Sequence, residues 1–179
     1  AEFKFWHEGD DCFYVMTDSS GNRVRTDQFP VACHKINQLM PALIVLLQSN
    51  EILRRKLFQV DFLAATTEEA VITLTYHKPV DEAWQAQAVT LQAALGCSII
   101  GRSRGKKIVI GHDFVTEQFT VAQETFIQQQ PESAFSQPNA VVNQQMLAWA
   151  YQHAQHNGGD FLELYCGNGN FTLPLSRCF

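Results

Sequence analysis

The chain has 179 residues, of which 46% are hydrophobic, and its formal net charge at pH 7 is −5. This length and composition provide a sizeable core for one domain or two small ones, and no apolar run approaches the roughly 18 residues that a bilayer span needs. The five cysteines are widely spaced and form no Cys-x-x-Cys pair. Their spacing argues against a zinc site or an iron–sulfur cluster and favours reduced thiols in a cytoplasmic protein without a metal.

The basic residues are concentrated in the first part of the chain. Residues 1–107 contain 12 of the 13 Lys and Arg residues together with 12 acidic residues, whereas residues 108–179 contain only Arg177 and six acidic residues. The net charge by itself argues against nucleic-acid binding. A surface for nucleic acid, if the protein has one, is therefore expected within residues 1–107.

The beginning of the chain predicts a hairpin, an edge strand and a helix. Polar and apolar residues alternate over 2–6, and an apolar run at 12–16 follows a turn at 9–11, which together predict a hairpin. Apolar residues then recur at helical spacing from Ile36 to Leu47, and Pro41 inside that pattern predicts a kink or a restart. The expected strands are 2–6, 12–16 and 23–25.

The middle of the chain predicts four more strands and a second helix. Asp81 is a candidate N-cap for a helix that buries Trp84 and Leu91. Residues 113–127 contain only short strand-like pieces. The expected strands are 57–64, 70–76, 97–101 and 107–110.

The character of the sequence changes at residues 128–133, a polar segment with a proline that is typical of a linker. A third helix is expected to follow, with Asn139 as its candidate cap. Apolar residues that include Met146 and Trp149 fall on one face of this helix, and residues 157–159, Asn-Gly-Gly, end it.

The next segment predicts a strand, a glycine-rich turn and a helix start. Residues 161–165 are apolar and indicate a short buried strand, Gly167 and Gly169 form the turn, and Asn170 begins the helix. This arrangement forms the ligand crevice of a doubly wound α/β sheet, where helix N–H groups attract polar or anionic ligands. Two glycines at this spacing also occur in ordinary turns, so the spacing alone leaves both interpretations open. A dinucleotide fingerprint would need a third glycine, where Thr172 stands.

Two segments together resemble the RNA uracil-C5 methyltransferases. Phe135-Ser-Gln-Pro-Asn139 resembles the family's Phe-x-Gln-x-Asn segment, and Leu162-Glu-Leu-Tyr-Cys-Gly-Asn-Gly-Asn-Phe171 resembles its S-adenosylmethionine loop. The resemblance covers nearly the whole chain. Upstream segments are similar to the bacterial tRNA (uracil-5-)-methyltransferase branch; they are 1–6, Asp27-Gln-Phe-Pro30, Ile36-Asn-Gln-Leu-Met40, Lys56-Leu-Phe-Gln-Val-Asp61 and Tyr76-His-Lys78.

The resemblance implies two parts. Residues 1–130 would be an α+β RNA-recognition part, and residues 131–179 would be the truncated N-terminal portion of an α/β, Rossmann-like, S-adenosylmethionine-dependent methyltransferase domain. The implied partner is the T-arm of tRNA, or another T-loop-like RNA. The full-length protein is expected to be monomeric.

The implied reaction is the methylation of uracil C5 in the T-loop of tRNA. A cysteine thiolate adds to C6, C5 takes the methyl group of S-adenosylmethionine, a glutamate removes the C5 proton, and the cysteine is eliminated. The family segments that carry this cysteine and this glutamate are not in the sequence, nor are the acidic residues that would hold the ribose and adenine. No catalytic residue is therefore assigned, and the chain alone is expected to be an inactive fragment.

The residues expected to serve the cofactor also follow from the resemblance. Without it, a turn beside a buried tyrosine would explain the same residues. Cys166 lies in the loop, but no Asn-Pro follows it, so we expect a small residue packed beneath the loop rather than the nucleophile. The expected cofactor contacts are Gln137, Tyr165 and Asn170, in a loop shaped by Gly167 and Gly169.

The residues expected to bind RNA form two sets. Phe58 and His77 match family positions that stack against T-loop bases, although a strand phenylalanine is as often a core residue. The second set is a basic cluster that would hold phosphates or is simply a solvated turn, and Arg54-Arg-Lys56 allows the same two interpretations. The residues of this cluster are Arg102, Arg104, Lys106 and Lys107.

Two other functions remain open from the sequence. The chain would fit a non-catalytic RNA-binding module that retains a vestigial cofactor loop. A fragment of a nucleotide-binding oxidoreductase is a weaker alternative, because the third glycine of its fingerprint is missing.

Overall fold

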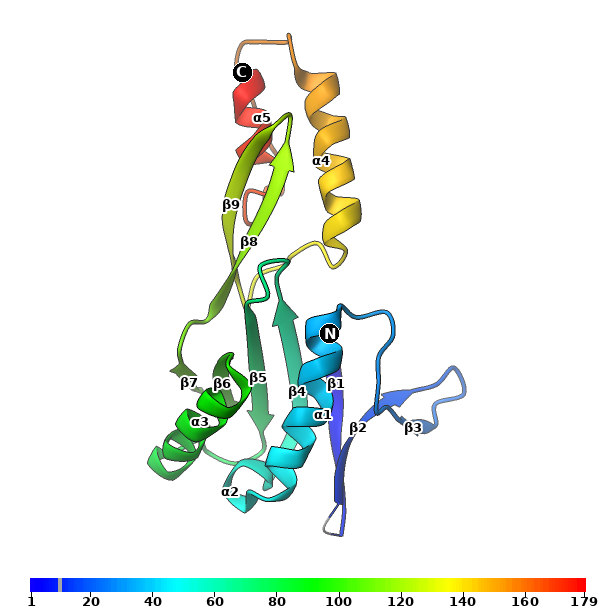
Figure 1. The fold of residues 1–179 in the computed structure, drawn as a ribbon, viewed down its shortest axis with the longest axis vertical. Coiled ribbons are helices and arrows are strands. Elements are labelled where there is room, and N and C mark those ends of the chain that lie inside the picture. The colour runs from blue at the N-terminus through cyan, green and yellow to red at the C-terminus, as the bar shows by residue number, and fades with distance from the viewer. Residues whose placement is uncertain (10) are drawn as a thin grey trace. The chain divides into compact units, whose positions relative to one another are not determined.

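The computed structural model describes residues 1–9 and 11–179. The chain forms two compact units, of which the first comprises Ala1–Ala64 and Glu68–Asp113 and the second comprises Ala65–Thr67 and Phe114–Phe179 (Figure 1). Among the described residues, none of the helices is both long and apolar enough to cross a membrane.

The first unit is built on one mixed sheet. Its strands lie in the order β3-β2-β1-β4-β5-β6-β7, and all neighbours are antiparallel except β5 and β6, which are parallel and joined through α3. In chain order the elements are β1 (Glu2–Glu8), β2 (Asp11–Thr17), β3 (Arg23–Arg25), α1 (His34–Gln48), α2 (Glu51–Arg54), β4 (Leu57–Ala64), β5 (Ala70–Tyr76), α3 (Glu82–Leu95), β6 (Ser98–Ser103) and β7 (Lys106–Ile110).

One face of this sheet packs against the helices and forms the core. Each fully buried large apolar side chain stabilises such a core by roughly 1.5–3 kcal/mol. Trp84 of α3 is completely buried, and a Cβ at Gly101 of β6 would lie 2.4 Å from its ring. Glycine is therefore required at this point of β6. Core residues of the sheet and helices include Phe3, Phe5, Tyr14, Leu39, Leu43, Val60, Phe62, Ile72, Leu74, Trp84, Leu91 and Ile99.

The elements of the first unit confirm the sequence predictions closely. The expected strand bounds of β4 and β5 are those observed, and Asp81 caps α3 by accepting a hydrogen bond from the Trp84 N–H at 2.8 Å. Helix α1 runs through Pro41 as one helix, so the predicted restart is wrong. The expected turn at 9–11 includes residue 10, which lies outside the described residues.

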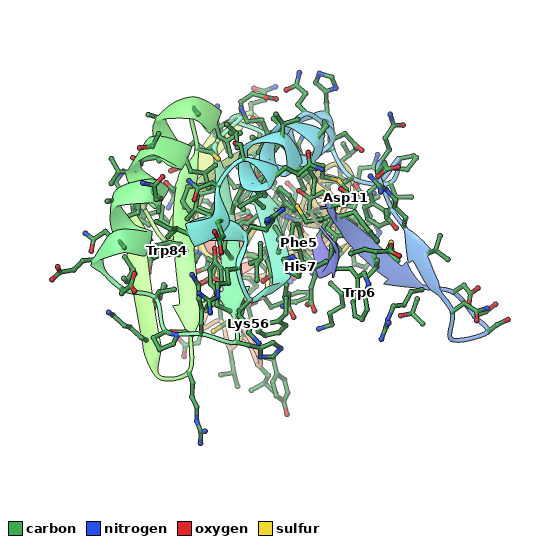
Figure 2. The ribbon with its side chains drawn as sticks, turned by 90° about the horizontal axis from the view of Figure 1, so that it is seen from below. Phe5, Trp6, His7, Asp11, Lys56 and Trp84 are labelled. Carbon is green, nitrogen blue, oxygen red and sulfur yellow. The ribbon has the colours of Figure 1, made fainter. Side chains whose placement is uncertain are left out.

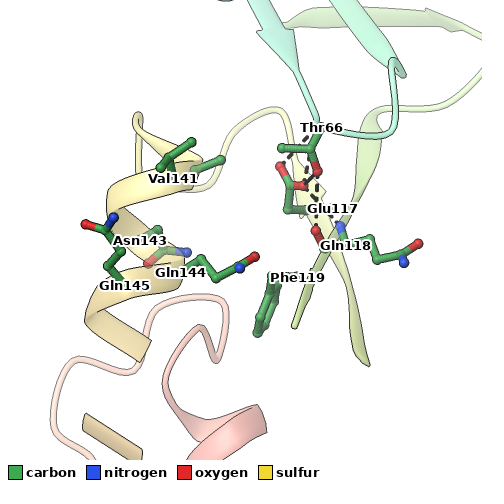
Figure 3. A pocket seen from close by; sticks show the side chains of 9 residues that line it. Thr66, Glu117, Gln118, Phe119, Val141, Asn143, Gln144 and Gln145 are labelled. Carbon is green, nitrogen blue, oxygen red and sulfur yellow. Dashed lines mark hydrogen bonds between the residues drawn. The ribbon is translucent and has the colours of Figure 1, made fainter. Parts of the chain in front are cut away.

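The second unit is a hairpin covered by a helix. Ala122 and Gln123 form the hairpin turn with φ of 50° and 68°, the left-handed conformation that two-residue hairpin turns require. Buried Glu117 accepts hydrogen bonds from the N–H and the hydroxyl of Thr66, which ties segment 65–67 to the hairpin (Figure 3). The elements are β8 (Phe114–Val121), β9 (Glu124–Pro131), α4 (Ala140–Ala154), α5 (Thr172–Leu175) and a 3-10 turn (Ser176–Cys178).

The expected buried strand at residues 161–165 is not formed. In the described structure neither strand of the hairpin pairs with this segment, and its Leu162 and Leu164 are 81% and 74% exposed. A strand is stabilised by hydrogen bonds to a neighbour, so apolar composition without a pairing partner leaves this segment irregular. The predicted helix start is confirmed near Asn170, where α5 begins at Thr172.

The predicted linker at 128–133 is also wrong over its first half. Residues 128–131 belong to β9, where Gln128 and Gln130 are buried and Gln129 is exposed. Buried and exposed positions alternate here as in a strand, but all three residues are glutamines, so the sequence shows no alternation of polar and apolar residues. The predicted boundary between the two parts, after residue 130, falls near the end of β9 and stays a prediction.

The expected apolar face of α4 is exposed. Asn139 caps the helix as predicted, accepting a hydrogen bond from the Val142 N–H at 3.0 Å. The buried residues are Asn143 and Leu147, whereas Met146 and Trp149 lie outside. The face of α4 that packs against the hairpin is therefore the one with Leu147, which belongs to the hairpin core.

Candidate functional site

The glycine loop of the second unit turns through three residues with left-handed backbone. Tyr165, Gly167 and Gly169 have φ of 59°, 56° and 76°. Glycine adopts this conformation without strain, which explains its two positions here. The loop closes with a hydrogen bond from the Gly169 N–H to the Cys166 carbonyl at 2.9 Å and leads into α5.

The loop is open to solvent. The side chain of Tyr165 is fully exposed, and nothing lies within 4 Å of a Cβ placed on Gly167. Cys166 is also exposed, so the prediction that it packs beneath the loop is wrong. Exposed backbone and an exposed aromatic ring give a ligand direct access to this loop.

Side-chain amides hold the loop to its own unit. Asn143 of α4 and Asn170 donate to each other's carbonyl oxygens, at 2.9 and 2.7 Å. Gln128 of β9 donates to the Asn168 carbonyl at 2.6 Å, and the Asn168 side chain donates to the Gln129 carbonyl. The loop is therefore fastened on two sides by amides rather than by a strand ladder.

The other cofactor residue expected from the sequence lies away from these contacts. Gln137 is half-buried in the segment between β9 and α4, and in the described part of the chain no hydrogen bond joins it to the loop. A pocket of about 210 Å³ lies between β8 and the first half of α4, lined in part by Glu117, Phe119 and Gln144 (Figure 3). None of the expected cofactor residues lines it.

Phe58 and His77 form a stacked pair in the first unit. Their ring centroids are 3.8 Å apart and the rings are tilted by 11°. Leu57 pairs with Tyr76 and Gln59 with Thr75, so Phe58 is an extra residue without a partner, which makes a β-bulge. Bulges redirect a side chain, and this one brings half-buried Phe58 against exposed His77.

The basic cluster surrounds the β6–β7 hairpin turn. Arg102 pairs with Lys107 across the strands, and Arg104 and Lys106 flank the turn glycine, Gly105, whose φ is 74°. Arg104 and Lys106 are exposed. Lys107 contacts the Asp113 carboxylate at 2.8 Å, and this hydrogen bond lowers the pKa of Asp113. Lys107 is therefore partly neutralised, and Arg104 and Lys106 are the more available cations.

Several residues beside these sites did not stand out in the sequence. His7 contacts the Leu57 carbonyl through Nε2 at 2.7 Å, next to the bulge. Asn143 and Gln128 hold the glycine loop. Asn143 did not stand out because the expected face of the helix was the one with Met146 and Trp149, whereas the buried residues are Asn143 and Leu147. His7 had no signal either, since it lies at the end of an alternating strand.

Known proteins match this chain along its whole length. The family model described as tRNA (Uracil-5-)-methyltransferase matches residues 1–179. This chain belongs to the tRNA (uracil-5-)-methyltransferase family. A tRNA/tmRNA (uracil-C(5))-methyltransferase of Stutzerimonas stutzeri is 52% identical over 178 residues, which are 98% of this chain and 49% of that protein. The corresponding protein of Idiomarina loihiensis is 49% identical over 184 residues, covering all of this chain and 50% of its own length.

A solved structure of a tRNA (uracil-5-)-methyltransferase shares the mixed α/β fold. It is the Pyrococcus abyssi tRNA (uracil-54, C5)-methyltransferase in complex with S-adenosyl-L-homocysteine, with a TM-score of 0.68 and 15% identity over 98% of this chain and 46% of that chain. The chain spans about half the length of the curated relatives that it matches. The fold and the family are thus established for residues 1–179.

Proposed function

We propose that this chain is part of an enzyme that methylates C5 of a uridine in the T-loop of tRNA with S-adenosylmethionine. The observation that carries this proposal is the family match over residues 1–179, with curated relatives named tRNA/tmRNA (uracil-C(5))-methyltransferases. S-adenosylmethionine supplies the methyl group. The chain itself contributes the binding and orientation of the cofactor and of the RNA.

The glycine loop fits a cofactor of this kind. Its backbone is left-handed at three residues, Tyr165 is fully exposed, and the space around Gly167 is open, so a ligand can approach the backbone closely. We assign the cofactor contacts to Tyr165 and Asn170, with Gln137 as a third contact. The amide pair between Asn143 and Asn170 supports this role, because it fixes the residue that must meet the ligand.

The stacked pair and the basic hairpin serve the RNA in this proposal. One face of the His77 ring is occupied by Phe58, so an unstacked T-loop base would lie on the other face and extend the stack. Arg104 and Lys106, together with Arg102 and Lys107, would contact phosphates, which gives affinity without sequence choice. Because phosphate contacts do not distinguish bases, any choice of nucleotide by this chain would come from the stacked pair, Phe58 and His77.

The nucleophile and the base belong, in this proposal, to the length of the relatives that this chain does not span. A cysteine thiolate there adds to C6 of the uracil, and C5 then takes the methyl group from S-adenosylmethionine, which leaves as S-adenosylhomocysteine. A glutamate removes the C5 proton, and the cysteine is eliminated from C6 as the C5–C6 double bond is restored. The two exposed cysteines of residues 1–179, Cys33 and Cys166, are not assigned this role.

The test uses the full-length protein and a T-arm RNA with tritium at C5 of its loop uridine. Release of tritium that depends on S-adenosylmethionine, equal to the methyl groups incorporated, is the expected result. A T-arm RNA with cytidine at that position is the control and should release nothing. If the protein binds the T-arm RNA tightly but transfers no methyl group, the alternative of a non-catalytic RNA-binding module is correct.

A further inference from the structure

Lys56, the residue before β4, has a backbone conformation that does not suit it. Its φ is 64°, in the left-handed region, although it is neither glycine nor asparagine. Residues with a side chain adopt this region at a cost of roughly 1–2 kcal/mol. Such strain persists only where the surrounding structure imposes it, and it is concentrated at binding sites.

Two hydrogen bonds impose this conformation. The His77 N–H donates to the Lys56 carbonyl at 2.9 Å, and the His7 ring donates through Nε2 to the Leu57 carbonyl at 2.7 Å. Leu57 is buried and pairs with Tyr76, so the chain is fixed immediately after Lys56. The same contacts position the bulge residue Phe58. Lys56 therefore belongs to the structure that builds the aromatic stack.

The ammonium group of Lys56 faces solvent beside that stack. Lys56 is exposed (Figure 2), and among the described residues no ion pair or hydrogen bond of its ammonium group is found. The neighbouring Lys78 differs, because its Nζ donates to the Ile52 carbonyl at 2.7 Å and burial lowers its pKa. Arg55 is also exposed and adds a second positive charge. The start of β4 thus combines a stacking platform with a cation that has no partner among the described residues.

We propose that Lys56 binds the RNA phosphate next to the nucleotide that stacks on His77. Single-stranded RNA is held by aromatic rings for bases and by cations for the backbone, so both groups are needed within one nucleotide of each other. The His77 N–H donates to the Lys56 carbonyl at 2.9 Å, so the backbone of Lys56 is fixed directly against one member of the stack. This inference rests on the proposed RNA-binding function of Phe58 and His77.

The test is Lys56→Gly in the full-length protein. Glycine relieves the backbone strain, which should stabilise the protein, and it removes the charge, which should weaken RNA binding. Stability and RNA affinity should therefore change in opposite directions. We expect an unfolding midpoint equal to or above that of the wild type, a three- to tenfold loss of affinity for T-arm RNA, and a salt dependence of log K that is about 0.7 less steep, as for one single-strand phosphate contact. The affinity for S-adenosylmethionine should not change.

Glu68→Gly is the matched control, because Glu68 is another exposed residue with a left-handed φ, 67°. It should leave RNA affinity unchanged. Lys56→Asn, which removes the charge but tolerates the conformation, should lose as much affinity as Lys56→Gly, and Lys56→Arg should retain most of it. RNA affinity and salt slope equal to the wild type in Lys56→Gly and Lys56→Asn would overturn the inference. If the wild-type protein does not bind T-arm RNA at all, both the proposed function and this inference are wrong.

Discussion

The stacked pair of the first unit and the glycine loop of the second are held in different ways. Phe58 lies on β4 of a seven-stranded sheet and His77 directly follows β5, so their positions follow from the register of β4 and β5. The loop around Asn170 has no strand beneath it and is held by side-chain amides from α4 and β9. A site on a sheet is therefore positioned by the backbone, whereas the loop depends on a few individual side chains.

The largest expected effect is a loss of stability in the first unit, whose sheet positions the stacked pair. Gly101→Ala places a methyl group 2.4 Å from the buried Trp84 ring, and we expect a loss of about 2–3 kcal/mol in the free energy of unfolding of the first unit. Chemical denaturation measures it. Trp84→Leu makes room, so the double variant should be less destabilised than the sum of the single variants. Additive losses would mean that Trp84 is not the obstacle.

The next effect concerns the stacking site. His77→Ala should weaken binding of T-arm RNA by about 1–3 kcal/mol, the usual contribution of a base stacked on an aromatic ring, and should leave S-adenosylmethionine affinity intact. Phe58→Ala should lose a similar amount, because it supports the same stack. Fluorescence anisotropy with labelled RNA measures both. Unchanged RNA affinity in the two variants would remove the stack from the binding surface.

The third effect concerns the loop. Asn143→Leu removes the partner of the Asn170 amide and leaves it unsatisfied, at a cost of about 1–2 kcal/mol. We expect roughly tenfold weaker binding of S-adenosylmethionine by calorimetry on the full-length protein, with unchanged RNA affinity. Gln145→Leu, on the exposed side of the same helix, is the control. Equal losses in both variants would show that the helix, and not the amide pair, determines the result.

The smallest effect concerns the basic hairpin. The double variant Arg104→Gln and Lys106→Gln should reduce RNA affinity only a few-fold at physiological salt, and the salt slope should fall by about 1.4, as for two single-strand contacts. Arg177→Gln serves as the control, because Arg177 lies in the second unit and pairs with Glu124. If the slope is that of the wild type, the hairpin residues are solvated charges.

The sequence predicted the first unit well because its periodicity and its caps are local signals. Runs rich in apolar residues predicted β4 and β5 with their observed bounds, and Asp81 predicted the start of α3. The stacking of Phe58 on His77 could not be derived in this way, since it depends on a bulge. The family resemblance singled out both residues as base-stacking positions but did not predict that they stack on each other.

The second unit was harder for a physical reason. Its hairpin turns at Ala122 and Gln123 without a glycine, and glutamines occupy two of the three buried positions of β9, so neither the turn nor the alternation was visible. The apolar run at 161–165 predicted a strand because composition says nothing about whether a pairing partner is present. The glycines of the loop were found because left-handed backbone restricts residue type strongly.

The bulge in β4 has a consequence for how the stacking site can be gained or lost. Leu57 and Gln59 already have consecutive partners on β5, Tyr76 and Thr75, so the strand contains one residue more than its ladder requires. Removal of the single codon for Phe58 would leave a regular antiparallel pair with every later side chain still on its present face. The pairing of this strand is thus separable from its aromatic ring, and a one-residue deletion would remove the proposed base-binding ring while the strand stays paired.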